Sequence, residues 1–165
     1  MVKMSGEKEG MAEKQMGQTF DKLARDIQES LLEGYSEKFK SEFLNPKNIG
    51  KIEDPDCCVS ITGVCGDTIE MSLSIDKGRI SDIKFMTDGC GATISCASFV
   101  TRTAKGKSIE EALLITQDDV DRYFEGLPDE HKHCAKLAVM TLHALLEAYR
   151  KKPNPEKPGD DNIAE

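Results

Sequence analysis

Three consecutive runs in which apolar and polar residues alternate constrain the fold of this chain most strongly. They cover residues 57–64, 67–76 and 79–87. Every second side chain of a strand lies on the same face, so the apolar residues of the second run form one buried face. The last two runs are joined by DKGR, where Gly78 can adopt a positive φ, and this turn favours a hairpin. We therefore predict a small antiparallel sheet with one face on the core.

Helical periodicity dominates the rest of the chain. Apolar residues recur at helical spacing over residues 20–34. Ser36, Ser108 and Thr116 stand where N-caps are preferred, and Glu111 follows Ser108 at the spacing of a capping box. Further helices are expected over residues 36–44, 92–106, 108–115, 116–126 and 131–152.

The last of these helices carries a broad apolar stripe that is expected to lie on the core. The stripe consists of Leu137, Val139, Met140, Leu142, Leu145 and Leu146. Together the elements predict the α+β class, with a small three-stranded antiparallel sheet and helices packed on one face of it.

We divide the chain into three parts. Residues 1–34 form an N-terminal extension, with a disordered or fraying start over residues 1–17 and then the amphipathic helix. Residues 35–152 form the main domain. Residues 153–165, which hold three prolines and many charges, are expected to be a disordered tail.

The overall charge excludes one class of partner. A formal net charge of −8 means that most of the surface repels polyanions, so we expect no nucleic-acid partner. No window approaches the roughly 20 apolar residues of a membrane-spanning helix, and the start of the chain lacks the apolar core of a signal peptide. We expect a cytoplasmic protein without a membrane partner.

In a reducing compartment, the six cysteines of this chain are hydrophobic fillers, metal ligands or nucleophiles. Cys65 lies in the turn between the first two strands, Cys90 between the third strand and its helix, and Cys134 in the first turn of the last helix. Glycines beside Cys65 and Cys90 allow unusual dihedral angles and close approach to a bound group. With Asp67 and His133 nearby, these thiols form the donor set of a tetrahedral zinc site or an iron-sulfur cluster.

Inert packing remains the alternative for each cysteine, since any single loop cysteine is more often inert than functional. It is the favoured interpretation for the other three. Cys57 and Cys58 are adjacent on a strand, point to opposite faces and cannot line one site. Cys96 lies in a segment rich in small residues, and an approach to the site from behind stays open.

Five motifs occur in order between residues 35 and 150. They are YSEKFKSEFLNPKNIG from Tyr35, CGD from Cys65, GRISDIKFMTDGCGATISCAS from Gly78, AKGKSIEEAL from Ala104 and HCAKLA from His133. In this order they resemble the IscU family of iron-sulfur cluster assembly scaffolds, which is also found as the N-terminal domain of NifU. The resemblance implies the same small sheet with helices, and a scaffold rather than an enzyme.

The resemblance also implies roles for single residues. Cys65, Cys90 and Cys134 would be the cluster ligands, Asp67 or His133 would complete the site, and Cys134 would accept persulfide. A cysteine desulfurase would supply the sulfur, a ferredoxin-type donor the electrons, and apo-proteins would receive a labile [2Fe-2S] cluster. Iron would bind at these ligands, zinc would occupy them in isolated protein, and a homodimer is a further expectation.

The chain departs from the family pattern at several positions. LPDEH, from Leu127, replaces the usual chaperone-binding sequence, so chaperone dependence stays open, and His131 stands where a lysine is usual. Asp88 adds a negative charge beside Cys90, and the helix before Tyr35 is extra; it would cover the sheet or mediate dimer contacts.

Two other functions remain open from the sequence. The first is a zinc-dependent sulfurtransferase that resembles the SufU branch, against which the histidine beside Cys134 argues. The second is a structural zinc site, although ligands in glycine-flanked loops differ from tight zinc knuckles.

Overall fold

The computed structural model describes residues 6–153, and of residues 6–15 it describes the backbone only. The chain divides into two compact units between Tyr35 and Ser36. The domain boundaries expected from the sequence, as functional units, stay a prediction.

The first unit contains one long helix, α1 (Gly6–Leu31). The expectation of an irregular segment up to residue 17 is wrong for residues 6–17, while residues 1–5 lie outside the described part. This segment lacks a sustained apolar period, but it is rich in Glu, Lys, Met, Ala and Gln, which are strong helix formers. The apolar stripe of α1 is exposed, with Phe20 at 65% and Leu31 at 73%.

The second unit holds the other elements. In chain order they are α2 (Glu37–Leu44), β1 (Cys57–Thr62), β2 (Thr68–Asp76), β3 (Arg79–Thr87), α3 (Gly91–Ala104), α4 (Ile109–Ala112), α5 (Gln117–Tyr123), the 3-10 helix η1 (Asp129–His131) and α6 (Lys132–Lys151). The predicted caps form, since the hydroxyls of Ser36, Ser108 and Thr116 each accept a backbone N–H in the first turn of their helix. Elements and caps of this unit follow the predicted order.

The sheet has the order β1-β2-β3 with both pairs antiparallel. Asp76 pairs with Arg79 across a two-residue turn in which Lys77 and Gly78 both have positive φ, as a tight hairpin requires. A register shift between Ser74 and Ile75 inserts one extra residue into β3. This bulge changes the side-chain alternation of β3, so that Ile80 and Ile83 both lie in the core.

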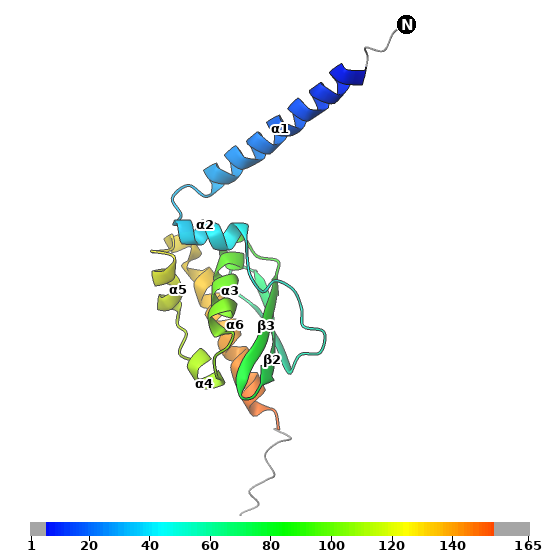
Figure 1. The fold of residues 1–165 in the computed structure, drawn as a ribbon. Helices are drawn as coiled ribbons and strands as arrows, with labels where there is room; N and C mark the ends of the chain where they lie inside the picture. Colours follow the sequence, from blue (N-terminus) through cyan, green and yellow to red (C-terminus); the bar gives the residue numbers. More distant parts are fainter. Residues whose placement is uncertain (1–5, 154–165) are drawn as a thin grey trace, which may run out of the picture. The chain divides into compact units, whose positions relative to one another are not determined.

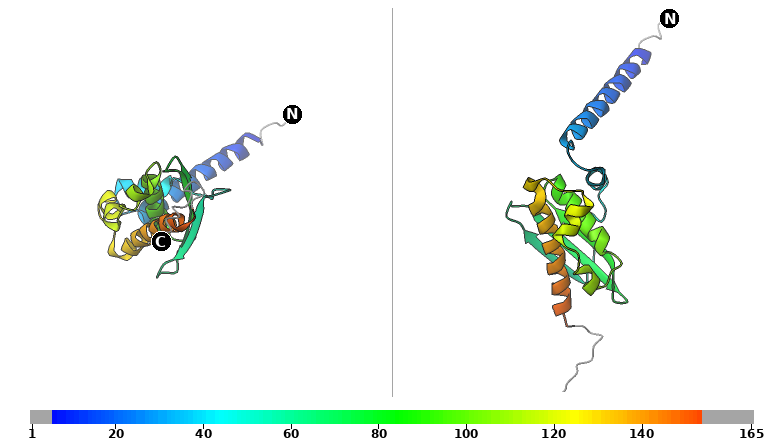
Figure 2. Two further views of the ribbon diagram at one scale, coloured as in Figure 1. Left: turned by 90° about the horizontal axis from the view of Figure 1, so that it is seen from below. Right: turned by 90° about the vertical axis from the view of Figure 1, so that its left-hand side faces the viewer.

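Helices α3 and α6 pack on one face of the sheet (Figures 1 and 2). The buried apolar strand residues are Cys57, Ile69, Met71, Leu73, Ile80, Ile83 and Phe85, and α6 contributes Leu137, Val139, Leu142, Leu145 and Leu146. Met140 is 47% exposed, so its placement in the core stripe is wrong. It lies at the solvent edge, because a stripe wider than the contact with the sheet exposes its margin. The predicted α+β architecture is otherwise confirmed.

Residues 48–50 add a short parallel pairing along the outer edge of β3. The N–H of Phe85 donates to the carbonyl of Asn48, and the N–H of Gly50 donates to the carbonyl of Phe85, both at 2.9 Å. The N–H of Lys47 donates to the Ser98 hydroxyl of α3 at 2.8 Å. The connection after α2 therefore covers one edge of the sheet and fixes α2 beside α3.

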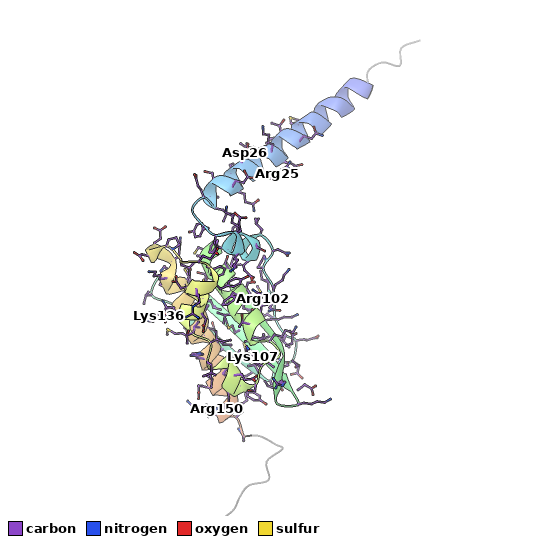
Figure 3. The ribbon with its side chains drawn as sticks, turned by 60° about the vertical axis from the view of Figure 1, so that its left-hand side comes forward. Arg25, Asp26, Arg102, Lys107, Lys136 and Arg150 are labelled. Atoms are coloured by element: carbon purple, nitrogen blue, oxygen red, sulfur yellow. The ribbon has the colours of Figure 1, made fainter. Side chains whose placement is uncertain are left out.

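A buried carboxylate links α2 to the remaining helices. Glu42 of α2 is 6% exposed and accepts hydrogen bonds from Ser98 at 2.5 Å and from Nε of Arg102 at 3.0 Å. Arg102 lies on α3 and is labelled in Figure 3. The hydroxyl of Tyr123, in α5, also donates to Glu42. These contacts hold α2 against α3 and α5.

Candidate metal centre

One end of the domain collects three chain segments that carry the predicted ligands. β1 ends at Thr62, β2 begins at Thr68 and β3 ends at Thr87, so the β1–β2 turn and the start of α3 lie at the same end of the sheet. α6 begins there too, and Figure 2 shows it running along the sheet from its gold start to its orange end. The fold thus brings Cys65, Cys90 and Cys134 to one end.

Cys65 lies in the turn between β1 and β2. The N–H of Gly63 donates to the carbonyl of Asp67 at 2.8 Å, and the N–H of Gly66 donates to that of Gly63 at 3.1 Å. Gly66 has φ +89°, which a residue with a side chain rarely adopts. This tight turn exposes the thiol of Cys65 and places Asp67 directly before β2.

Cys90 occupies the N-cap position of α3, between two glycines, and is exposed. Neither glycine has a positive φ, so the expected role in unusual dihedral angles applies only to Gly66. Instead they permit close approach: a Cβ on Gly89 would lie 2.8 Å from Oδ2 of Asp67, and one on Gly91 would lie 2.4 Å from the Phe43 ring. The turn and α2 therefore pack directly against the start of α3.

Thr93, which sequence reasoning did not single out, joins the ligands. It is fully buried, its hydroxyl donates to Oδ2 of Asp67 at 2.8 Å, and Oγ1 lies 3.7 Å from Sγ of Cys90. The only signal in the sequence is its position three residues after Cys90, one helical turn away. Asp88 accepts a 2.7 Å hydrogen bond from the N–H of Thr68, which fixes its carboxylate at the start of β2.

Cys134 is buried in the first turn of α6. Burial raises the pKa of its thiol to about 12; a hydrogen bond with Thr93 opposes this shift, and the nearby thiols of Cys90 and Cys65 add to it. Without a cation, Cys134 is therefore a protonated thiol at neutral pH, whereas a bound metal ion would stabilise the thiolate. Nε2 of His133 lies 3.5 Å from its Sγ.

His131 is the histidine that lies within reach of two thiols. One ligand atom from each of Cys90, His131 and Cys134 lies within 4.8 Å of the other two. Sequence analysis noted His131 as a departure but not as a ligand, although its spacing of three residues from Cys134 places both side chains on one face at the start of α6. Among the described residues, Cys90, His131 and Cys134 are the group of three possible metal ligands whose donor atoms already lie close together.

The remaining cysteines lie where the sequence predicted. Cys57 is buried and Cys58 is exposed, as neighbours on one strand must be. Cys96 of α3 is fully buried, and burial raises the pKa of its thiol well above the usual value, with smaller contributions from the neighbouring thiols of Cys134 and Cys90. Cys96 therefore lies behind the site as an uncharged thiol.

Chemically, this end of the domain offers thiol sulfur, imidazole nitrogen and one carboxylate. These donors suit zinc, iron and iron-sulfur clusters. The exposed Cys65 and Cys90 make the site open to solvent, and the carboxylate of Asp67 is already engaged by Thr93. Such an arrangement has the donors to hold a metal ion without enclosing it. Within residues 6–153, no helix is long and apolar enough to cross a membrane.

Known proteins resemble the chain in sequence. A family model described as NifU-like N terminal domain matches residues 34–156. The chain is 45% identical over 119 residues to the iron-sulfur cluster assembly scaffold protein IscU 1 of Archaeoglobus fulgidus, which covers 71% of this chain and 78% of that protein. It is 37% identical over 123 residues to the iron-sulfur cluster assembly scaffold protein IscU of Escherichia coli, which covers 72% and 95%.

Solved structures resemble the fold. The NifU-like N-terminal protein of Brucella abortus matches with a TM-score of 0.62 at 18% identity, covering 72% of this chain and 95% of that one. A putative iron-sulfur cluster assembly scaffold protein for the SUF system from Fervidobacterium islandicum matches with a TM-score of 0.58 at 21% identity, covering 68% and 96%. At these identities the similarity supports the fold alone.

Proposed function

The chain belongs to the NifU-like N-terminal domain family, and from this premise we propose that it is a scaffold for iron-sulfur cluster assembly. The relatives named as such scaffolds support the general function. We further propose that the cluster is [2Fe-2S], with Cys65, Cys90 and Cys134 as ligands. Asp67 and His133 are the candidates for the fourth position.

The observation that carries the proposal is the convergence of the three thiols at one open end of the domain. The sulfur atoms of Cys90 and Cys134 lie within 4.8 Å of each other. Cys65 lies outside that close group, in the exposed turn at the same end of the sheet. A scaffold has to hold iron and sulfide and then release them. Ligands from an exposed turn and from two helix ends, with one carboxylate, support both steps, since a carboxylate is the harder and more weakly held ligand of iron beside thiolates.

In the proposed reaction, Cys134 receives sulfur from a cysteine desulfurase. Its thiolate attacks the outer sulfur of the enzyme's cysteine persulfide, the S–S bond there breaks, and the enzyme's cysteine leaves as a thiolate. Two electrons from a ferredoxin-type donor then cleave the persulfide on Cys134 and release sulfide to iron. The burial of Cys134 means that this transfer requires the start of α6 to open or a cation to be bound.

The protein itself would turn over no substrate in this reaction, because the desulfurase and the electron donor supply the chemistry. We propose apo-proteins as the acceptors of the finished cluster and the cytoplasm as the compartment. Zinc is the ion we expect at the same ligands in isolated protein. A homodimer stays part of the proposal.

Anaerobic reconstitution tests the proposal. The full chain is incubated with ferrous iron, cysteine and a desulfurase, and visible absorption is recorded. A labile chromophore is expected, and it should be lost in Cys65→Ser and Cys90→Ser but kept in Cys58→Ser, an exposed cysteine outside the site. Colourless protein that keeps one tightly held zinc ion and accepts sulfur would instead favour the sulfurtransferase function.

A further inference from the structure

We infer that His131 is a metal ligand of this chain, and that it forms with Cys90 and Cys134 a site for a single divalent ion. The inference rests on the proposed function for its use, since this site would hold the first metal ion before a cluster is built. It adds a residue to the ligand set of that function, which consists of Cys65, Cys90 and Cys134 with Asp67 or His133.

The distances support direct ligation. In a tetrahedral zinc site, with metal–sulfur bonds of about 2.3 Å and metal–nitrogen bonds of about 2.0 Å, the ligand atoms are about 3.5–3.8 Å apart. The three ligand atoms of Cys90, His131 and Cys134 lie within 4.8 Å of one another. A contraction of about 1 Å therefore places the three ligand atoms at three corners of a tetrahedron around one ion.

The backbone fixes His131 in this position. It is the last residue of η1 and the N-cap of α6, and its N–H donates to the carbonyl of Pro128 at 2.8 Å. Its side chain is 24% exposed, and Nδ1 is buried. Its Nε2 lies 3.6 Å from a carboxylate oxygen of Glu130. A small movement gives the carboxylate–imidazole pair that commonly orients a metal-bound histidine.

The other candidate ligands are less available in this arrangement. Oδ2 of Asp67 accepts the hydrogen bond of Thr93, so it has to leave that partner before it binds a cation with the same oxygen. His133 lies 3.5 Å from Cys134 but outside the group that includes Cys90. His131 is thus the nitrogen donor closest to both thiols together. Asp67 and Cys65 would join when the second iron and sulfide arrive.

The chain has three histidines, which allows a matched test. Each of His131, His133 and His143 is changed to Gln in the full chain, and anaerobic Co²⁺ titrations are followed by visible absorption. His143 is the control, because its Nε2 lies 2.9 Å from the carbonyl of Ile115, away from the thiols. We expect His131→Gln to weaken Co²⁺ binding about tenfold or more and to change the ligand-field bands. His143→Gln should change neither.

A second variant distinguishes the loss of a ligand from misfolding of the protein. His131→Cys replaces nitrogen by a third sulfur, so Co²⁺ binding should be kept while the thiolate-to-cobalt charge-transfer absorption increases by about half, from two thiolates to three. Unchanged affinity and spectrum in His131→Gln, with loss in His133→Gln, would overturn the inference. So would an unchanged charge-transfer absorption in His131→Cys.

The scaffold function and the ligand role of His131 can be disproved independently of each other. If the wild-type chain binds Co²⁺ through His131 but forms no chromophore with iron and a desulfurase, the scaffold function is wrong and the ion site stands. If the chromophore forms equally in the wild type and His131→Gln, and Co²⁺ binding is equal too, the scaffold stands and the ligand assignment is wrong.

Discussion

The hydroxyl of Thr93 donates a 2.8 Å hydrogen bond to Oδ2 of Asp67, and this contact joins the β1–β2 turn to the first turn of α3. Gly89 makes it sterically feasible, since a Cβ there would lie 2.8 Å from the same oxygen. A carboxylate oxygen that accepts a hydrogen bond donates less electron density to a cation. Asp67 is therefore linked through Thr93 to Cys90, whose Sγ lies 3.7 Å from the same hydroxyl oxygen. In the proposed scaffold, it would be the ligand that leaves the metal most readily.

Changing Asp67→Ala should slow the loss of an assembled cluster to an acceptor. The carboxylate is the ligand that exchanges most readily, and without it the remaining ligands release the cluster through a higher barrier. We expect transfer about tenfold slower, equivalent to about 1.4 kcal/mol. The decay of cluster absorption on mixing with an apo-ferredoxin measures it. Equal transfer rates in the wild type and the variant would show that Asp67 has no such role.

Changing Thr93→Val should weaken metal binding. Valine keeps the volume but removes the hydrogen bonds to Asp67 and Cys134, so we expect about tenfold lower Co²⁺ affinity. Thr93→Ser should restore most of it. Thr141→Val is the matched control, because Thr141 is another fully buried threonine whose hydroxyl donates only to the carbonyl of Leu137. Equal effects of both valine variants would indicate general destabilisation rather than a role at the site.

The sheet could be predicted because its information is local. Alternation over residues 67–76 fixes the buried face of β2, and Gly78 fixes the hairpin. The positions of Cys65 and Cys90 in turns followed from the same strand ends. The start of α1 could not be predicted from the spacing of apolar residues. Its first turns form because their residues have high helix propensity, and they lack a regular apolar face.

The partners of the ligands could not be predicted for another reason. Thr93 and Asp67 are 26 residues apart, and Phe43 meets Gly91 across the interface between α2 and α3. Such contacts arise from tertiary packing, which no periodic pattern records. His131 shows the intermediate case, since its helical spacing to Cys134 is local but its distance to Cys90 depends on how α3 and α6 pack.

The capping box of α4 predicts a pH dependence of stability. The backbone hydrogen bond from Ser108, followed by the charge of Arg79, holds the pKa of the Glu111 carboxyl below its usual value. A lowered pKa in the folded state stabilises the protein above the usual carboxyl range, near pH 4, and this contribution is lost as the pH falls through the folded pKa. Glu111→Gln should therefore lower the free energy of unfolding more at pH 7 than at pH 3, as urea titrations would measure. Glu110→Gln is the control, and an equal loss at both pH values contradicts the prediction.

The buried carboxylate of Glu42 makes the partly exposed Arg102 important for the stability of the fold. Its side chain is 7% exposed, whereas that of its partner Arg102 is 41% exposed. Removing one partner of a fully buried pair costs about 3–5 kcal/mol, because the other charge stays buried without compensation. Solvent reaches Arg102, so we expect Arg102→Ala to cost about 2–3 kcal/mol in the free energy of unfolding. The exposed pair of Arg150 and Glu147 gives the control, where Arg150→Ala should cost about 0.5 kcal/mol or less.

The same pair allows a compensation test. In the double variant Glu42→Gln with Arg102→Ala, no charge is left buried, and the amide can still accept the hydrogen bond of Ser98. Chemical denaturation should therefore find the double variant more stable than Arg102→Ala alone, by about 1 kcal/mol or more. If the two losses add instead, the arginine acts through packing on Phe99 and Tyr123, over whose rings its guanidinium lies at 5.7 and 5.4 Å. In that case the Glu42 carboxylate is satisfied by the hydroxyls of Ser98 and Tyr123 without the arginine. Hydroxyl hydrogen bonds and ring contacts, rather than the ion pair, would then hold α2 to its neighbours.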